Sequence, residues 1–161
     1  MSRDQRLILA GMAGALGITV ALFFLPVGHG GGDALRIACL CLTAPALCVT
    51  AGVGFVANRR FFHGEAIHGG VRTPAIELGQ RYLANTVEQS VLAAMAWLAF
   101  AAVSADRATS MLPALAVTFV AARTAFAIGY AIAPWARAFG LALTFYPSVA
   151  VILFTVAALL R

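Results

Sequence analysis

Charged residues are scarce in this sequence of 161 residues: only 11% are Asp, Glu, Lys or Arg, and none is lysine. A soluble domain carries about 25% charged residues, so a water-soluble globule of this length is excluded for want of polar side chains to cover it. Disorder is excluded too, because disordered chains combine low hydrophobicity with high charge, whereas 62% of these residues are hydrophobic. The composition therefore indicates an integral membrane protein of one domain.

Cysteine and proline are also rare. Cys39, Cys41 and Cys48 all lie in one apolar stretch, where cysteine behaves as a small hydrophobic residue and lacks a neighbouring base or cation to activate it. We expect these thiols to pack, and no disulfide is implied. Pro45 and Pro147 lie inside apolar stretches, where they predict kinks.

Five apolar stretches are long enough to cross a bilayer as helices, which takes about 20 residues. Strict apolar–polar alternation is missing from them, so an all-α membrane protein is predicted. The first stretch is longer than the apolar core of a signal peptide, and no small-x-small cleavage site follows it, so we expect it to be retained. The five stretches are residues 7–25, 35–57, 78–103, 112–132 and 139–160.

The arginines predict the orientation of these spans. Placing the N-terminus in the cytoplasm puts seven arginines in cytoplasmic segments and three outside. The positive-inside rule therefore predicts a cytoplasmic N-terminus, a cytoplasmic loop over 58–77 and a C-terminus on the other side. The net charge of +5 is a signal of topology, and no nucleic-acid binding is expected, because no basic face with base-reading groups is visible.

The linkers between the spans differ in composition. Residues 26–34 are rich in glycine and predict a flexible turn, 104–111 predict a short polar hairpin, and 134–137 predict a tight one. Only the loop 58–77 is long and charged, and long loops often carry function.

That loop contains a weak suggestion of a metal site. His63, Glu65 and His68 supply two imidazoles and a carboxylate, which could bind zinc. Their spacing matches no established motif, and the loop around them is rich in glycine. We therefore expect no metal.

The third stretch differs from the others because its first half is polar. At 100° per residue, Glu77, Arg81, Asn85 and Glu88 fall within about 80° of one another, and Gln89 extends the edge of this polar stripe. A charged residue such as Arg or Asp near the centre of a span costs about 2.5–3.5 kcal/mol, so such side chains must face protein or a water-filled cavity. The stripe therefore predicts a site inside the membrane.

The fourth stretch contains a matching charge, Arg123. Glu88 lies about 15 Å and Arg123 about 13–14 Å from the cytoplasmic ends of their helices at 1.5 Å per residue. Antiparallel neighbours would place these charges at similar depth, so the spacing predicts a Glu88–Arg123 pair. The same arithmetic places Tyr130 near the level of Arg81, with Arg137 at the cytoplasmic rim.

Arg59 and Arg60 end the second stretch at the same rim, so the sequence predicts a cleft that opens to the cytoplasm. Arginine binds carboxylates in a bidentate manner, and Glu88 could take an ammonium group. A small zwitterion with more than one carboxylate would fit this cleft. The residues alone equally allow a polar clasp that holds the helices together without any ligand.

Two ordered motifs on consecutive helices resemble the MAPEG family, the membrane-associated proteins in eicosanoid and glutathione metabolism. The resemblance covers about residues 35–161. Arg81-x3-Asn85-x2-Glu88-Gln89 is similar to the family's signature helix, which shows Arg-x3-Asn-x2-Glu followed by Tyr or Gln. The second motif is Ala122-Arg123-x-x-Phe126-x-x-Gly129-Tyr130, followed by Arg137. Arg59-Arg60 corresponds to the basic end of the family's first helix.

The resemblance implies a four-helix protomer over 35–161 that forms a homotrimer and binds glutathione between neighbouring protomers. Residues 1–34 have no counterpart in the usual four-helix unit and are expected to add one transmembrane helix and a glycine-rich turn. Arg137 matches the arginine that stabilises the glutathione thiolate in enzymatic members. The residues implied to hold glutathione are Arg81, Asn85, Glu88, Gln89 and Tyr130, with Arg59 or Arg60 from the adjacent subunit.

By resemblance, the function is that of a glutathione-dependent transferase or peroxidase whose lipophilic substrate arrives from the bilayer. Phe126 departs from the family pattern, because many catalytic members have Tyr there. Some members bind lipid and do no chemistry. A non-catalytic protein that binds glutathione or lipid, and a purely structural helix bundle, therefore stay open as alternatives.

Overall fold

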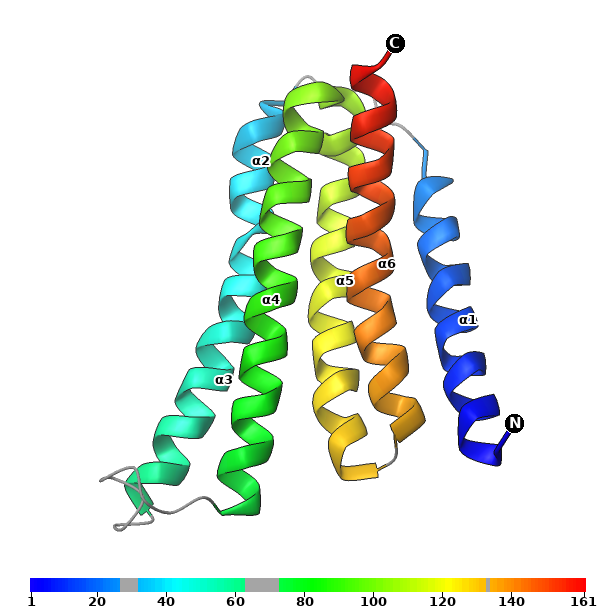
Figure 1. Ribbon diagram of the computed structural model, residues 1–161. Coiled ribbons are helices and arrows are strands. Elements are labelled where there is room, and N and C mark those ends of the chain that lie inside the picture. The colour runs from blue at the N-terminus through cyan, green and yellow to red at the C-terminus, as the bar shows by residue number, and fades with distance from the viewer. Residues whose placement is uncertain (27–31, 63–72, 133) are drawn as a thin grey trace.

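A computed structural model describes residues 1–26, 32–62, 73–132 and 134–161 of the chain (Figure 1). The described residues form helices and no strand, which confirms the all-α class, and five helical segments are long and apolar enough to cross a membrane. The second of these segments, Ala34–Phe62, consists of two helices in succession. The helices are α1 (Arg3–Phe23), α2 (Ala34–Cys41), α3 (Thr43–Phe62), α4 (Pro74–Val103), α5 (Ala105–Ile132) and α6 (Pro134–Leu159).

The helices run up and down in one bundle, with the two chain termini at opposite ends (Figure 1). The end that carries the N-terminus also carries the last turn of α3, the first turn of α4 and the junction of α5 with α6; we call it the N-terminal end. Helix α1 lies on the outside of the bundle and packs chiefly against α6. Helices α2 to α6 therefore form the body of the bundle, and α1 packs on one side of it.

The second span breaks between α2 and α3 because of Pro45. Proline has no backbone N–H to donate to the carbonyl of Cys41, so α2 ends at Cys41 and α3 begins at Thr43. The kink predicted at this position is therefore confirmed as a break. Helix α6, in contrast, continues through Pro147 without ending.

Two linkers predicted from composition are wrong, because helices occupy them. Residues 104–111 belong to α5 from Ala105 onward, and Ser104 alone separates α4 from α5. Its carbonyl accepts from the N–H of Ala108 at 2.8 Å, and Asp106 provides a favourable negative charge in the first turn. Residues 134–137 form the first turn of α6, where a proline is tolerated because the first N–H groups of a helix have no partner within it.

Helix α1 is attached to the body by close packing and by one arginine. A Cβ atom on Gly11 would lie 3.3 Å from the Cβ of Phe139, so this glycine lets α1 approach α6 closely. At the other end of α1, Arg107 of α5 donates a hydrogen bond to the carbonyl of Phe23 at 2.5 Å. The guanidinium of Arg107 also lies 5.1 Å from the ring centroid of Phe154. One side chain therefore ties the last turn of α1 to both α5 and α6.

Two glycines bring α5 and α6 into backbone contact near the N-terminal end. A Cβ atom on Gly140 would lie 2.5 Å from the backbone nitrogen of Phe126, and one on Gly129 would overlap with the backbone of Arg137. Real Cβ atoms essentially never approach other atoms this closely. The crossing therefore depends on glycine at both positions, and it places Arg137 beside the residue that follows Gly129, which is Tyr130.

Candidate functional site

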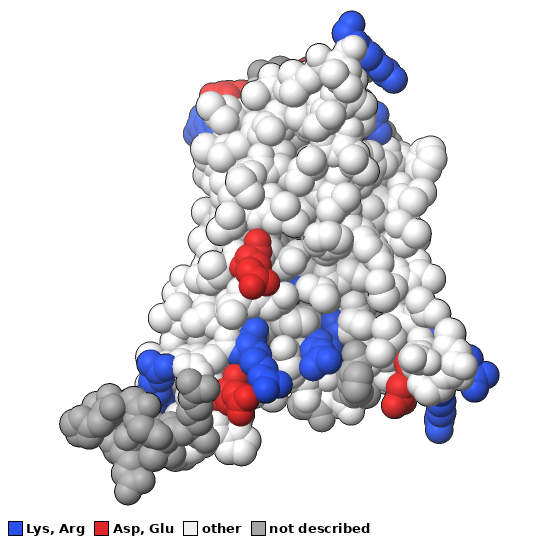
Figure 2. Space-filling model, in the orientation of Figure 1, with Lys and Arg blue, Asp and Glu red and all other residues white. Residues whose placement is uncertain are grey.

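The polar stripe of α4 divides into an exposed edge and an inward edge. Glu77 and Arg81 form an ion pair of 2.6 Å, with 47% and 64% of their side chains exposed. Glu88 is exposed as well, although it is the middle residue of a helix of 30 residues. Acidic and basic side chains share this face of the bundle and gather toward the N-terminal end (Figure 2). The exposed edge thus presents both charge signs on a surface that is otherwise apolar.

The inward edge of the stripe faces Arg123 of α5, which is completely buried. Asn85 accepts a hydrogen bond from Nη1 of Arg123 at 2.8 Å. The Nη2 atom donates to the carbonyl of Gly140 at 3.1 Å and to the hydroxyl of Thr144 at 2.5 Å. The ring of Phe126 lies against the guanidinium, 4.5 Å from its carbon to the ring centroid. Arg123 therefore joins α4, α5 and α6 in the interior of the protomer.

The predicted Glu88–Arg123 pair is wrong for the protomer. Within the described part of the chain, the ion pair that forms is Arg81–Glu77, and Glu88 points out of the bundle. The two helices do place these residues near the same depth, but Asn85 and Glu88 differ by about 60° around α4. That rotation turns Asn85 toward Arg123 and Glu88 away from it.

Gln89 lies still farther around α4 and is buried, with 8% of its surface exposed. Its Oε1 atom has no hydrogen-bond partner among the described residues. The structure therefore does not bring Gln89 to the exposed edge where Arg81 and Glu88 lie.

A small polar pocket brings two of the predicted site residues together. Arg81 and Tyr130 line it, although they lie on different helices, and its volume is about 160 Å³. The guanidinium of the exposed Arg137 stands 5.1 Å from the ring centroid of Tyr130. The predicted proximity of Arg81, Tyr130 and Arg137 is thus present in the protomer. The full lining of this pocket, which we call the polar pocket, is Pro74, Glu77, Leu78, Arg81 and Tyr130.

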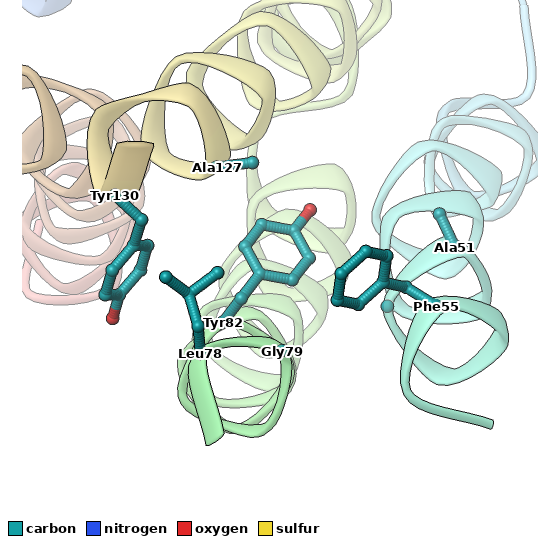
Figure 3. A pocket seen from close by; sticks show the side chains of 8 residues that line it. Ala51, Phe55, Leu78, Gly79, Tyr82, Ala127 and Tyr130 are labelled. Atoms are coloured by element: carbon teal, nitrogen blue, oxygen red, sulfur yellow. The ribbon is translucent and has the colours of Figure 1, made fainter. Parts of the chain in front are cut away.

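A larger pocket of about 300 Å³ lies next to it, between α3, α4 and α5 (Figure 3). Apart from Leu78, the residues of its walls are aromatic or small, and it shares Leu78 and Tyr130 with the polar pocket. Sequence reasoning missed this aromatic pocket, although glycines on facing helices were a signal that two spans approach closely. The residues that line it are Ala51, Gly52, Phe55, Leu78, Gly79, Tyr82, Ala127 and Tyr130.

Arg59 and Arg60 occupy the last turn of α3, where positive charge is favourable to the helix dipole. Both are exposed, and the guanidinium of Arg59 lies 5.3 Å from the ring centroid of Phe55. Neither residue lines the polar pocket of its own protomer. The resemblance implies a role for them in the site of an adjacent subunit, which stays a prediction.

The weak metal suggestion involves His63, Glu65 and His68, which lie outside the described residues. In the described ranges, no three His, Cys, Asp or Glu side chains are grouped so that they could hold a metal ion.

The sequence matches the family model of the MAPEG family over residues 35–158, which is most of the chain. The chain belongs to the MAPEG family. The match begins at the start of α2 and leaves out α1, the helix that packs on the outside of the body. No curated protein and no solved structure gives a match. Membership makes this a membrane protein of eicosanoid and glutathione metabolism. Of the motif residues, Asn85 and Phe126 contact Arg123, and Arg81 and Tyr130 line the polar pocket.

Proposed function

We propose that this MAPEG protein is a glutathione-dependent transferase or peroxidase that acts on lipophilic electrophiles. The observation that carries the proposal is the polar pocket near the N-terminal end of the bundle. Arg81 and Tyr130 both line it, and the guanidinium of Arg137 lies against the tyrosine ring. Arg81 and Tyr130 belong to the two motifs that resemble the family, and Arg137 is the arginine that follows the second one.

The charges of this region fit those of glutathione, which carries two carboxylates and one ammonium group. Arg81 is exposed and can take a carboxylate in a bidentate manner, and the exposed Arg137 is left for the sulfur. Glu88 is exposed and has the sign needed for the ammonium group. The neutral Asn85 is partly used, because its Oδ1 already accepts a hydrogen bond from Arg123.

The chemistry requires the thiolate of glutathione, since a thiol with a pKa of about 8.5 is mostly protonated at pH 7. A guanidinium such as that of Arg137 near the sulfur lowers the thiol pKa, and the proton passes to water. In the transfer reaction the sulfur forms a bond to the electrophilic carbon, and a halide or other leaving group departs with the electron pair of the broken bond. In the peroxidase reaction two thiols become a disulfide while a hydroperoxide becomes an alcohol and water.

A second copy of the chain would complete the site. Glu88 is an exposed charge at the middle of a membrane helix, and such a charge does not face lipid without a cost of a few kcal/mol. We propose that it faces the interface of a homotrimer, where glutathione and the Arg59–Arg60 end of a neighbouring protomer cover it. From the distribution of arginines we propose that this end of the bundle and the N-terminus lie in the cytoplasm.

The test is conjugation of glutathione to 1-chloro-2,4-dinitrobenzene by the detergent-solubilised full chain. We expect turnover above the rate without enzyme, and at least about a tenfold loss in kcat/KM for Arg137→Ala, the scale set by losing one charge-stabilising group. Arg36→Ala, which removes an exposed arginine at the opposite end, is the matched control and should retain activity. Equal rates with and without enzyme would refute the catalytic function.

One observation favours a non-catalytic binding protein as the second candidate. Phe126 is buried, with 3% of its surface exposed, and its ring covers Arg123. The position where many catalytic members have a tyrosine hydroxyl therefore serves packing in this chain. A thermal unfolding titration separates the candidates: glutathione raises the melting temperature in both, but only the enzyme consumes it. No shift with glutathione would leave only the structural bundle.

A further inference from the structure

The aromatic pocket is a cavity in which only one lining residue, Tyr130, belongs to the family motifs. Three rings from three different helices wall it: Phe55 of α3, Tyr82 of α4 and Tyr130 of α5. Glycines at 52 and 79 let two of these rings lie against neighbouring backbone, since a Cβ atom on Gly79 would come within 2.9 Å of the ring of Phe55. Flat aromatic surfaces therefore line the cavity.

The aromatic pocket adjoins the polar pocket and shares one wall with it. Leu78 and Tyr130 belong to both linings, and Figure 3 shows the side chain of Leu78 between the rings of Tyr130 and Tyr82. On one side of this wall lies the Arg81 guanidinium, and on the other side lies an almost wholly apolar space of about 300 Å³. A ligand in each pocket would meet its neighbour at Leu78 and Tyr130.

We propose that the aromatic pocket is the site of the second substrate, and that it takes a flat, uncharged molecule of one or two rings. The volume of about 300 Å³ is at the lower end of small-molecule pockets. Apolar walls that present three aromatic rings favour aromatic surfaces over flexible acyl chains, because offset and edge-to-face contacts with a ligand ring add to the burial of apolar area. This inference rests on the proposed function, since the polar pocket must hold the thiol.

Two alanines allow the pocket to be filled without disturbing the protein. Ala51 and Ala127 line it, and both are exposed in the protomer, so a leucine at either position extends into the cavity and not into the core. Ala121 is also exposed on α5 but lies on another face, about 120° around the helix from Ala127. Ala121→Leu is therefore the matched control for Ala127→Leu.

The first experiment measures occupancy without any need for catalysis. The full chain in detergent is irradiated with benzophenone, and the labelled peptides are identified by mass spectrometry. We expect labels on peptides that carry Phe55 or Tyr82, competition by naphthalene, and at least about a tenfold loss of labelling in Ala127→Leu and Ala51→Leu but not in Ala121→Leu. Labelling that the two pocket variants do not reduce, or that phospholipid displaces and naphthalene does not, would overturn the proposal.

The second experiment separates this inference from the proposed function. Ala127→Leu should raise the KM for 1-chloro-2,4-dinitrobenzene about tenfold and leave the KM for glutathione unchanged. An active wild type whose aromatic-substrate KM is not changed by either pocket variant would refute the subsite alone. An inactive wild type would refute the transferase, and the labelling result would then decide by itself whether the pocket takes flat aromatic molecules.

Discussion

The crossing of α5 and α6 permits a sharp test of how the site is held. Gly140→Ala places a Cβ atom 2.5 Å from the nitrogen of Phe126 and 2.7 Å from the carbonyl oxygen of Ala122. Ordinary contacts of a Cβ begin at 3.4 Å, so the two helices must separate by about 1 Å. Both atoms belong to helix backbone, which cannot rotate away as a side chain could.

The cost of this separation has two parts. Overpacking against a rigid neighbour costs about 1–3 kcal/mol. The separation also weakens the 3.1 Å hydrogen bond from the buried Arg123 to the Gly140 carbonyl, and a hydrogen bond to a charged group contributes about 1.5–3 kcal/mol. We therefore expect Gly140→Ala to lower the free energy of unfolding by about 3–5 kcal/mol.

The assay is unfolding in mixed micelles by titration with dodecyl sulfate, followed by circular dichroism. Gly54→Ala is the control, because a Cβ atom on Gly54 meets nothing within 4 Å and alanine favours helix over glycine by about 1 kcal/mol. We expect that variant to be as stable as the wild type or slightly more so. A Gly140→Ala protein within about 1 kcal/mol of Gly54→Ala would refute the close crossing.

Two further predictions concern the side chains that join the helices. Asn85→Ala should lower the free energy of unfolding by about 2–3 kcal/mol because it removes an acceptor from a buried arginine. Asn85→Asp keeps the acceptor and should not, so equal losses of the two variants in dodecyl sulfate titrations would contradict the prediction. Arg107→Ala should lower the free energy of detaching α1 from the body by about 2 kcal/mol and reduce the hydrogen-exchange protection of its last turns, with Arg36→Ala as the unaffected control. Unchanged protection would show that packing against α6 alone holds α1.

The sequence alone determined the class of protein and the helical content, because both depend on local composition. Charge scarcity and five long apolar stretches required a membrane bundle, and Pro45 predicted the position where the second span breaks. The motif spacing of α4 and α5 was enough to indicate the family. Composition failed at 104–111 and 134–137, since polar residues that suggest a loop serve equally well in the first turn of a helix.

Only the tertiary structure decided which edge of the polar stripe faces the interior. Spacing gives the angles between Asn85, Glu88 and Arg81 around α4, but the rotation of the whole helix is set by which face packs against α5 and α6. The burial of Ala93, Ala96 and Trp97 on the inward face fixes that rotation. It directs Asn85 to Arg123, leaves Glu88 on the surface, and opens the aromatic pocket between three helices. Such a cavity is made from residues far apart in the chain, so no local pattern could specify it.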